Sequence, residues 1–304
     1  KENPVYQSLA TKFFEHFLYI AGAMANVSGE SINLWDEEDE FFYDVLQTHD
    51  NQRIRIKLRS MVGLIPLFAV EVLEEEIFAG NPEFARRLMW FLKNRPDLAN
   101  LISRWQEKGR GERHLLWLLR GHRMKALLKR MLDPNEFLSQ YGIRAMSKIY
   151  ETTPFKFHAT GIDFTVRYTP GEAETALFGG NSNWRGPIWF PVNYLIIESL
   201  QRFHHYYGND FKVEHPTGSG NLLTLKEIAA DLSDRLIRIF RKDVNGKRPV
   251  FDDYQKMQDD KHFCDYIWFF EYFHGDKGRG AGATHQTGWT GLVAKLIQQR
   301  NRST

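Results

Sequence analysis

The chain has 304 residues, enough to bury a sizeable hydrophobic core in one or two domains. Apolar residues make up 42% and charged residues 26%, which are the proportions of a globular protein, and a net charge of +2 argues against a strongly charged partner such as nucleic acid. Aromatic residues are abundant at 14%, with eight tryptophans that suit either core packing or a sugar-binding groove.

The cysteine content and the apolar segments indicate where in the cell the protein is expected. Cys264 is the only cysteine, so no intrachain disulfide can form and oxidising secretion is not indicated. The longest apolar candidate, residues 61–73, is too short for a membrane span and is interrupted by Gly63 and Pro66. We therefore expect a cytoplasmic location and no membrane partner. The chain starts at Lys1 with no visible signal peptide, and we expect it to be part of a longer protein.

The first part of the chain is predicted to be mainly helical. Apolar spacing and breaker residues predict a helix from Pro4 to about 26–29, a hairpin with strands at 41–46 and 53–58, and helices at about 65–79, 82–94, 96–107 and 122–132. The clearest start is Asn81-Pro82, a capping residue followed by a proline in the first helical turn.

The second part continues the same pattern. Residues 157–168 predict a second short hairpin that turns at Gly161. A long helix is expected over 187–207 and ends at Gly208. Thr224 and Glu227 have capping-box spacing for a helix that extends to about residue 241, and a last helix begins near Gly288. The whole chain, residues 1–304, is interpreted as one mainly α domain or part of one, with two short hairpins and long loops.

Two loops carry an unusual mixture of polar and aromatic residues. Residues 179–190 hold two Asn, an Arg and two Trp at a helix start, between glycines that permit close backbone approach. They either contact a ligand or simply pack their Trp side chains into the core. In residues 268–276, Glu271 lies among six aromatic rings. If buried there it needs a partner or a raised pKa, as a catalytic acid or base does; otherwise it points outward from an aromatic strand.

A third loop, residues 275–290, is rich in glycine. It lacks the strand–loop–helix context and the Lys-Ser/Thr ending of a phosphate-binding loop. A flexible loop, or one that packs closely against a polar ligand, is the better interpretation, with His285 and Trp289 expected in the same pocket.

Other clusters have simpler explanations. The acidic run at 36–40, after Trp35, is interpreted as a solvated loop, with a metal site or substrate rim as the alternative. The basic stretch at 104–130 is interpreted as a solvated face, with an acidic partner as the alternative. The histidines lack metal-ligand spacing, and Cys264 beside Asp265 is a poor nucleophile candidate.

Three sequence blocks together resemble glycoside hydrolase family 63, which includes the processing α-glucosidase of N-glycan maturation. They are Asn-Trp-Arg-Gly-Pro-Ile-Trp at 183–189, Glu-Tyr-Phe-His-Gly-Asp at 271–276 and His-Gln-Thr-Gly-Trp-Thr at 285–290, preceded by Phe-Phe-Tyr-Asp at 41–44. The first block recurs in related toroidal glycosidases, whereas its combination with the Glu271 block is more specific.

The resemblance implies an (α/α)6 toroid and inverting hydrolysis of an α-glucosidic bond, with Glu271 as general base and no metal or cofactor. The general acid of the family is an Asp upstream of the matched blocks. The chain also has too few helices for twelve, so we expect the carboxy-terminal portion of an incomplete toroid. The expected substrate-binding residues are Trp35, Tyr43, Trp184, Arg185, Trp189, His285 and Trp289.

These inferences define the working hypothesis and its rivals. The hypothesis is a hydrolase acting on an oligosaccharide with α-linked glucose, with the amino-terminal part of the same protein as its partner. The alternatives are a non-catalytic carbohydrate-binding or scaffold fragment, and a module that binds an acidic partner through residues 104–130. We predict that Glu271 and the 183–189 loop converge, and that uncovered apolar helix faces make the isolated chain self-associate.

Overall fold

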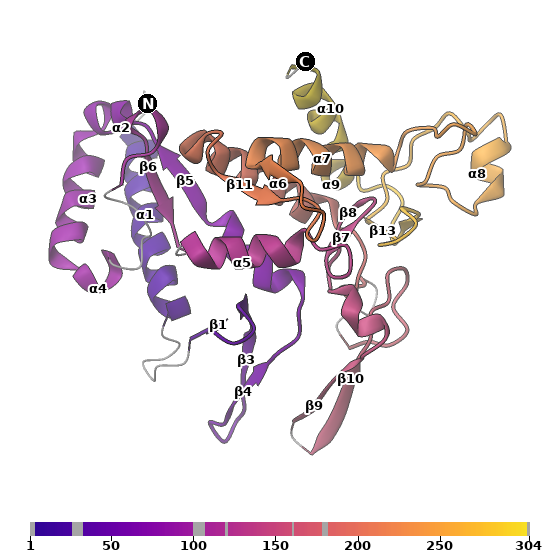
Figure 1. Cartoon of the computed structure of the whole chain (residues 1–304), viewed down its shortest axis with the longest axis horizontal. Coiled ribbons are helices and arrows are strands. Elements are labelled where there is room, and N and C mark those ends of the chain that lie inside the picture. The colour runs from indigo at the N-terminus through magenta and orange to yellow at the C-terminus, as the bar shows by residue number, and fades with distance from the viewer. Residues whose placement is uncertain are drawn as a thin grey trace.

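The computed structural model describes residues 4–25, 33–99, 107–118, 121–159, 161–177 and 182–302 (Figure 1). Within these ranges the chain is mainly helical, and every named strand belongs to a two-stranded antiparallel pair. The prediction of a mainly α protein is confirmed. The prediction of only two hairpins is wrong, because seven strand pairs are described.

The helices and 3-10 helices, in chain order, are α1 (Pro4–Ala25), η1 (Met61–Phe68), α2 (Glu75–Gly80), α3 (Pro82–Asn94), α4 (Pro96–Ala99), η2 (Arg110–Glu112), α5 (Gly121–Met131), η3 (Lys148–Glu151), α6 (Phe190–Tyr207), α7 (Leu225–Arg238), α8 (Gln255–Asp259), α9 (Thr287–Thr290) and α10 (Val293–Arg302).

The strand pairs are β1 (Trp35–Asp36) with β2 (Phe41–Phe42), β3 (Asp44–Gln47) with β4 (Arg53–Ile56), β5 (Val70–Leu73) with β6 (His114–Trp117), β7 (Leu138–Ser139) with β8 (Gly142–Ile143), β9 (Phe155–Ala159) with β10 (Ile162–Val166), β11 (Lys212–Glu214) with β12 (Leu222–Thr224), and β13 (Tyr272–Phe273) with β14 (Gly280–Ala281).

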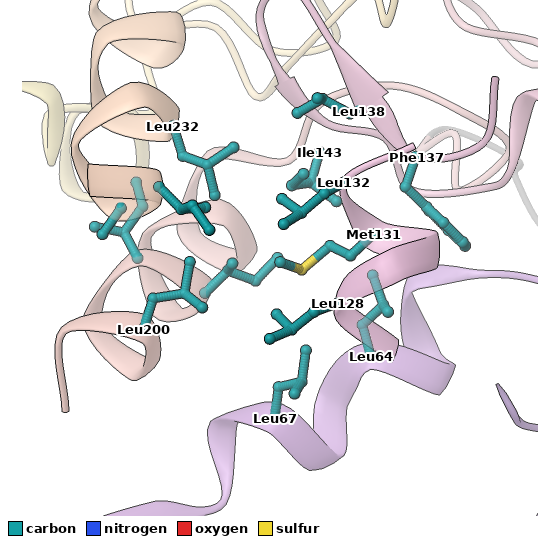
Figure 2. Packing of buried hydrophobic residues seen from close by; sticks show 14 of the residues in the cluster. Leu64, Leu67, Leu128, Met131, Leu132, Phe137, Leu138, Ile143, Leu200 and Leu232 are labelled. Carbon is teal, nitrogen blue, oxygen red and sulfur yellow. The ribbon is translucent and has the colours of Figure 1, made fainter. Parts of the chain in front are cut away.

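The main hydrophobic core lies where η1, α5, α6 and α7 meet. Burying apolar side chains from all four elements removes a large area from water and holds them together. In Figure 2 these side chains point toward one another from four elements: Leu64 and Leu67 of η1, Leu128 and Met131 of α5, Leu200 of α6 and Leu232 of α7. A smaller core joins α1 to α3 at one end of the molecule (Figure 1), through residues such as Phe14, Leu18 and Phe84.

Local capping chemistry explains the elements that were predicted well. Asn81 accepts the Phe84 N–H at the start of α3, and Thr224 and Glu227 form a complete capping box at the start of α7. Gly208, with φ of 72°, ends α6. The hairpin at Gly161 is confirmed as β9 and β10.

Other predictions are corrected. The single helix at 65–79 is wrong, because η1, β5 and α2 occupy residues 61–80, and β5 exchanges backbone hydrogen bonds with β6. The first hairpin begins at Asp44, since Phe41-Phe42 pairs instead with Trp35-Asp36. Residues 26–29 and 100–106, where two predicted helices were expected to end, lie outside the described ranges.

Candidate active site

The 183–189 loop and the 271–276 segment lie side by side. The Ile188 N–H donates to the Phe273 carbonyl at 2.8 Å, and the Phe273 N–H donates to the Ile188 carbonyl at 3.0 Å. A third segment joins them, because the Gly275 N–H donates to the Pro170 carbonyl at 2.8 Å. The predicted convergence is confirmed, and it occurs directly before the first residue of α6, Phe190.

Glu271 lies at the edge of this junction and is half-buried. Its Oε1 accepts a hydrogen bond from the Ser182 hydroxyl at 2.8 Å, and its Oε2 accepts one from the Ala283 N–H at 3.2 Å. Of the alternatives for Glu271, the structure shows a half-buried carboxylate with partners, since both oxygens have polar donors while neighbouring Phe270 and Tyr272 are buried. Two donors hold the carboxylate in one orientation.

An aromatic cluster of four side chains adjoins Glu271, consisting of Trp184, Trp189, Tyr272 and Trp289. Trp184 stacks flat on Trp189, with ring centroids 4.3 Å apart and planes at 4°. Trp189 also packs against Tyr272 and Trp289, at 5.0 Å and 6.2 Å between centroids. Trp189 is 2% exposed and Trp184 is 39% exposed. The buried Trp189 ring therefore supports one face of Trp184, whose other face is open to solvent. The Trp289 indole N–H donates to the Glu271 carbonyl at 3.1 Å, which joins the cluster to the carboxylate.

Arg185 faces inward and holds a neighbouring loop. It is 3% exposed, and its guanidinium donates to the Thr175 carbonyl at 3.0 Å and to the Thr175 hydroxyl at 3.2 Å. Burial lowers the pKa of Arg185, and the nearby Glu174 charge opposes that effect. Asn183 holds the same loop by donating to the Thr169 and Gly171 carbonyls at 2.5 and 2.6 Å.

This loop, residues 169–177, brings a carboxylate that the sequence analysis missed. The Tyr272 hydroxyl donates to Glu172 Oε2 at 3.0 Å. Burial raises the pKa of Tyr272, and the hydrogen bond to Glu172 together with the charges of Glu172 and Glu271 raises it further. The available sequence signal was a Pro170-Gly171 turn followed by two glutamates shortly before the first loop.

The remaining predicted site residues have contacts, within the described ranges, with residues other than the aromatic cluster. His285 is exposed, pairs with the Thr284 hydroxyl at 2.7 Å, and lies 5.4 Å from the Trp268 ring. Trp35 and Tyr43 are buried in the main core, whose members do not include Trp189. Their polar atoms bond within their own segment, Trp35 Nε1 to Glu37 at 2.9 Å and the Tyr43 hydroxyl to Asp39 at 3.1 Å. Tyr43 also borders an apolar cavity of about 250 Å³.

The acidic run at 36–40 is not a freely solvated loop. Asp36 is buried and pairs with Arg55 at 2.9 Å and Lys57 at 3.1 Å. Glu37 pairs with Arg123 at 2.7 Å, so part of the basic stretch at 104–130 neutralises this run within the chain. Two further cations of that stretch are paired, Arg113 with Glu74 and Arg130 with Glu136. The basic stretch is therefore less available to an acidic partner than its sequence suggested.

Metal ligands in suitable groups and membrane-spanning helices are both lacking in the described ranges. No group of three His, Cys, Asp or Glu side chains there is arranged to hold a metal ion. None of the helices described is both long and apolar enough to cross a membrane.

A carboxylate fixed beside an open tryptophan face, on a mainly helical scaffold, is the kind of site found in carbohydrate-active enzymes. The chain belongs to the family described as the mannosylglycerate hydrolase MGH1-like glycoside hydrolase domain, which matches residues 115–290 and includes both principal loops. The resemblance to glycoside hydrolase family 63 is thereby confirmed, and the protein is a member of a glycoside hydrolase family.

The chain is also similar to individual proteins. It is 49% identical to an uncharacterized protein of Saccharomyces cerevisiae, over 98% of this chain and 28% of that protein. It is 22% identical to the mannosyl-oligosaccharide glucosidase of the same yeast, over 58% of this chain and 15% of that protein. The solved family 63 mannosylglycerate hydrolase of Thermus thermophilus, in complex with glucose, is 17% identical with a TM-score of 0.32, covering 87% of this chain and 34% of that chain. The chain thus spans well under half the length of these relatives.

Proposed function

We propose that the chain belongs to an inverting glycoside hydrolase that cleaves α-glucosidic bonds. It supplies the part of the active site that contains the general base. Glu271 is the general base in this proposal. The observation that carries it is the position of the Glu271 carboxylate, oriented by Ser182 and Ala283 at the edge of the aromatic cluster. The resemblance of the 271–276 block to family 63 supports the same assignment.

The proposed chemistry needs two carboxyl groups. Glu271 takes a proton from water as that water attacks the anomeric carbon, and a protonated carboxylic acid on the opposite face protonates the leaving oxygen. In inverting enzymes the two groups stand roughly 6.5–9.5 Å apart, which leaves room for the water. Neither step uses a metal or a cofactor.

The general acid is proposed to come from a segment amino-terminal to Lys1, which would also complete an (α/α)6 toroid. The resemblance to family 63, whose general acid is an Asp upstream of the matched blocks, supports this proposal. The Saccharomyces cerevisiae relative also extends well beyond the length that this chain covers.

The proposed substrate is an oligosaccharide that ends in α-linked glucose. The open face of Trp184 suits stacking against the C–H face of a pyranose, and Trp189 holds that ring in place. Trp289 and Arg185 fix the surrounding loops, while Trp35, Tyr43 and His285 stay predictions as sugar contacts. We propose a cytoplasmic location and no nucleic-acid or membrane partner.

A second candidate is a carbohydrate-binding fragment without catalysis. The open face of Trp184, stacked on the buried Trp189, favours it, because such a ring can hold a sugar without an acid–base pair. It predicts that sugars bind but are not cleaved even when the amino-terminal segment is present.

The test is Glu271→Gln in the protein that includes the amino-terminal segment. Glutamine keeps the size of the side chain but cannot accept the water proton, so kcat should fall about 10²–10⁴-fold with little change in KM. The matched control is Glu83→Gln, an exposed carboxylate on distant α3.

The same samples test the stereochemistry. An inverting enzyme releases the β-anomer of glucose first, which NMR detects before mutarotation. A first-formed α-anomer would contradict inversion, and full kcat in Glu271→Gln would contradict the base assignment. Sugar binding without turnover in the unmodified protein would support the binding-fragment alternative.

A further inference from the structure

A pocket of about 350 Å³ lies among α6, α7 and α10, and we call it the three-helix pocket. His204 near the end of α6 lines it, together with Lys226 of α7 and Arg300 of α10. His204 follows Phe190, the first residue of α6, by 14 positions, which is roughly 20 Å along a helix. No member of the aromatic cluster lines the pocket, so what the pocket binds does not depend on the proposed function.

The lining of the three-helix pocket is basic. Four of the described residues that line it are Lys, Arg or His, and none of them is Asp or Glu. Arg300 already pairs with Asp234, through two nitrogens at 2.8 and 2.9 Å, and His205 contacts Glu74 at 2.6 Å. Lys226 is exposed, and its side chain has neither an ion pair nor a hydrogen bond with any other described residue. An anion that enters the pocket can therefore pair with Lys226.

His204 presents a second donor to the pocket. Its Nδ1 is buried without a hydrogen-bond partner among the described residues, whereas its Nε2 is not buried. Burial lowers the pKa of His204, and the charges of Lys226 and Arg110 lower it further against the opposing charge of Glu227. The imidazole is therefore neutral at pH 7. Because no described acceptor holds a proton on Nδ1, the proton belongs on Nε2, which can donate to a ligand oxygen.

The rest of the lining is neutral, and part of it can bond hydroxyl groups. Gln201 of α6 has a side-chain amide with no hydrogen bond to the other described residues. The Ser233 hydroxyl of α7 donates to the Ala229 carbonyl at 2.7 Å and can still accept a hydrogen bond. The volume is at the lower end of the range, roughly 300–1,000 Å³, that holds small organic ligands. It leaves room for more than a simple ion.

We infer that the three-helix pocket binds the phosphate monoester of a small sugar or polyol. The phosphate is placed at Lys226 and His204, and the hydroxyl groups at Gln201 and Ser233. A phosphate monoester carries about two negative charges and three acceptor oxygens, so it can pair with the ammonium of one helix and accept the imidazole N–H of the other.

The test is isothermal titration calorimetry of the full-length protein at pH 7 with sorbitol 6-phosphate, sorbitol and inorganic phosphate. Sorbitol is an open-chain polyol, so its binding does not require a pyranose face stacked on Trp184. Sorbitol 6-phosphate should bind about tenfold more tightly than either of the other two, the size of one hydrogen bond to a charged group. Added salt should weaken its binding, because Lys226 is exposed and salt screens its charge.

Three variants locate the binding. Lys226→Gln should weaken the binding of sorbitol 6-phosphate about tenfold. His204→Leu should weaken it as well, without lowering the free energy of unfolding, because the imidazole forms no hydrogen bond with the other described residues. Lys93→Gln removes an exposed cation on distant α3 and should leave the affinity unchanged.

Each contrary outcome overturns a stated part of the inference. Inorganic phosphate that binds as tightly as sorbitol 6-phosphate would refute the sugar or polyol part, and sorbitol that does so would refute the phosphate part. Undiminished binding in Lys226→Gln would show that the ligand lies outside the three-helix pocket. Binding of none of the three compounds would refute the site. These measurements leave the Glu271 assignment untouched, since that assignment is tested by turnover.

Discussion

At the residue scale, Gly282 determines how closely Glu271 can approach its neighbours. The backbone at Gly282 has φ of 71°, a conformation that favours glycine. A side chain there would also meet the Glu271 carboxylate and the Tyr272 ring, both closer than 3.0 Å. The glycine-rich loop is therefore closely packed against the proposed base, which agrees with one interpretation of its sequence.

This geometry predicts the effect of Gly282→Ala. A left-handed conformation costs an alanine about 1–2 kcal/mol, so the free energy of unfolding should fall by about that amount. The methyl group should also displace the Glu271 carboxylate and weaken sugar binding at Trp184. Gly288→Ala is the control, because no atom lies within 4 Å of a methyl group at that position in α9. Denaturant unfolding that shows equal stability for the two variants would count against this packing.

At the element scale, Asp36 ties β1 to the β3–β4 hairpin. Its carboxylate accepts the Asp39 N–H at 2.9 Å and pairs with Arg55 and Lys57 on β4 and directly after it. Burial alone would raise the pKa of Asp36. The backbone hydrogen bond and the two cations outweigh burial and lower the pKa to about 2.

The sign of the pH effect follows from that lowered pKa. Asp36 contributes stability at any pH above its unfolded pKa of 3.8, and this contribution is lost as the pH falls from there toward 2. Asp36→Asn should therefore be less stable than the unmodified chain at pH 6, and the difference should shrink by pH 2. Asp210→Asn, an exposed carboxylate after α6, should show no such convergence in denaturant unfolding measured across this range. A constant difference for Asp36→Asn from pH 6 to pH 2 would refute the assignment.

At the scale of the whole molecule, α1 exposes apolar side chains in addition to those that pack against α3. Tyr6, Phe13 and Ile20 recur at helical spacing, and they are 68%, 66% and 55% exposed. This surface continues into the exposed Val62 and Ile65 of η1, which border the apolar cavity beside Tyr43. Contiguous exposed apolar surface of this kind marks a site of association.

We therefore predict that this chain by itself self-associates, or that the proposed amino-terminal segment must cover α1 to keep it monomeric. Sedimentation velocity should show species larger than a 36 kDa monomer, and Phe13→Glu combined with Ile20→Glu should shift them toward the monomer. Leu222→Glu replaces an exposed apolar residue on β12, away from α1, and should leave the distribution unchanged. A compact monomer for the unmodified chain would refute the prediction and favour a self-contained domain.

Features that depend only on neighbouring residues could be predicted from the amino-acid sequence. Caps at Asn81 and Thr224, the stop at Gly208 and the turn at Gly161 act through hydrogen bonds and φ preferences within a few residues. For that reason the helices and hairpins that carry these signals were predicted close to their observed bounds. The loops flanking the site were recognised because their polar–aromatic composition is itself a sequence property.

Contacts between residues far apart in the chain could be recognised only in the folded structure. Ser182 and Glu271 are 89 positions apart, and Glu172 and Tyr272 are 100 positions apart, so no periodic pattern links them. Likewise, only packing shows that Arg185 faces inward and that the acidic run at 36–40 is paired with cations. Such contacts form when distant segments bury apolar surface together, and a polar side chain's partner then depends on the whole fold.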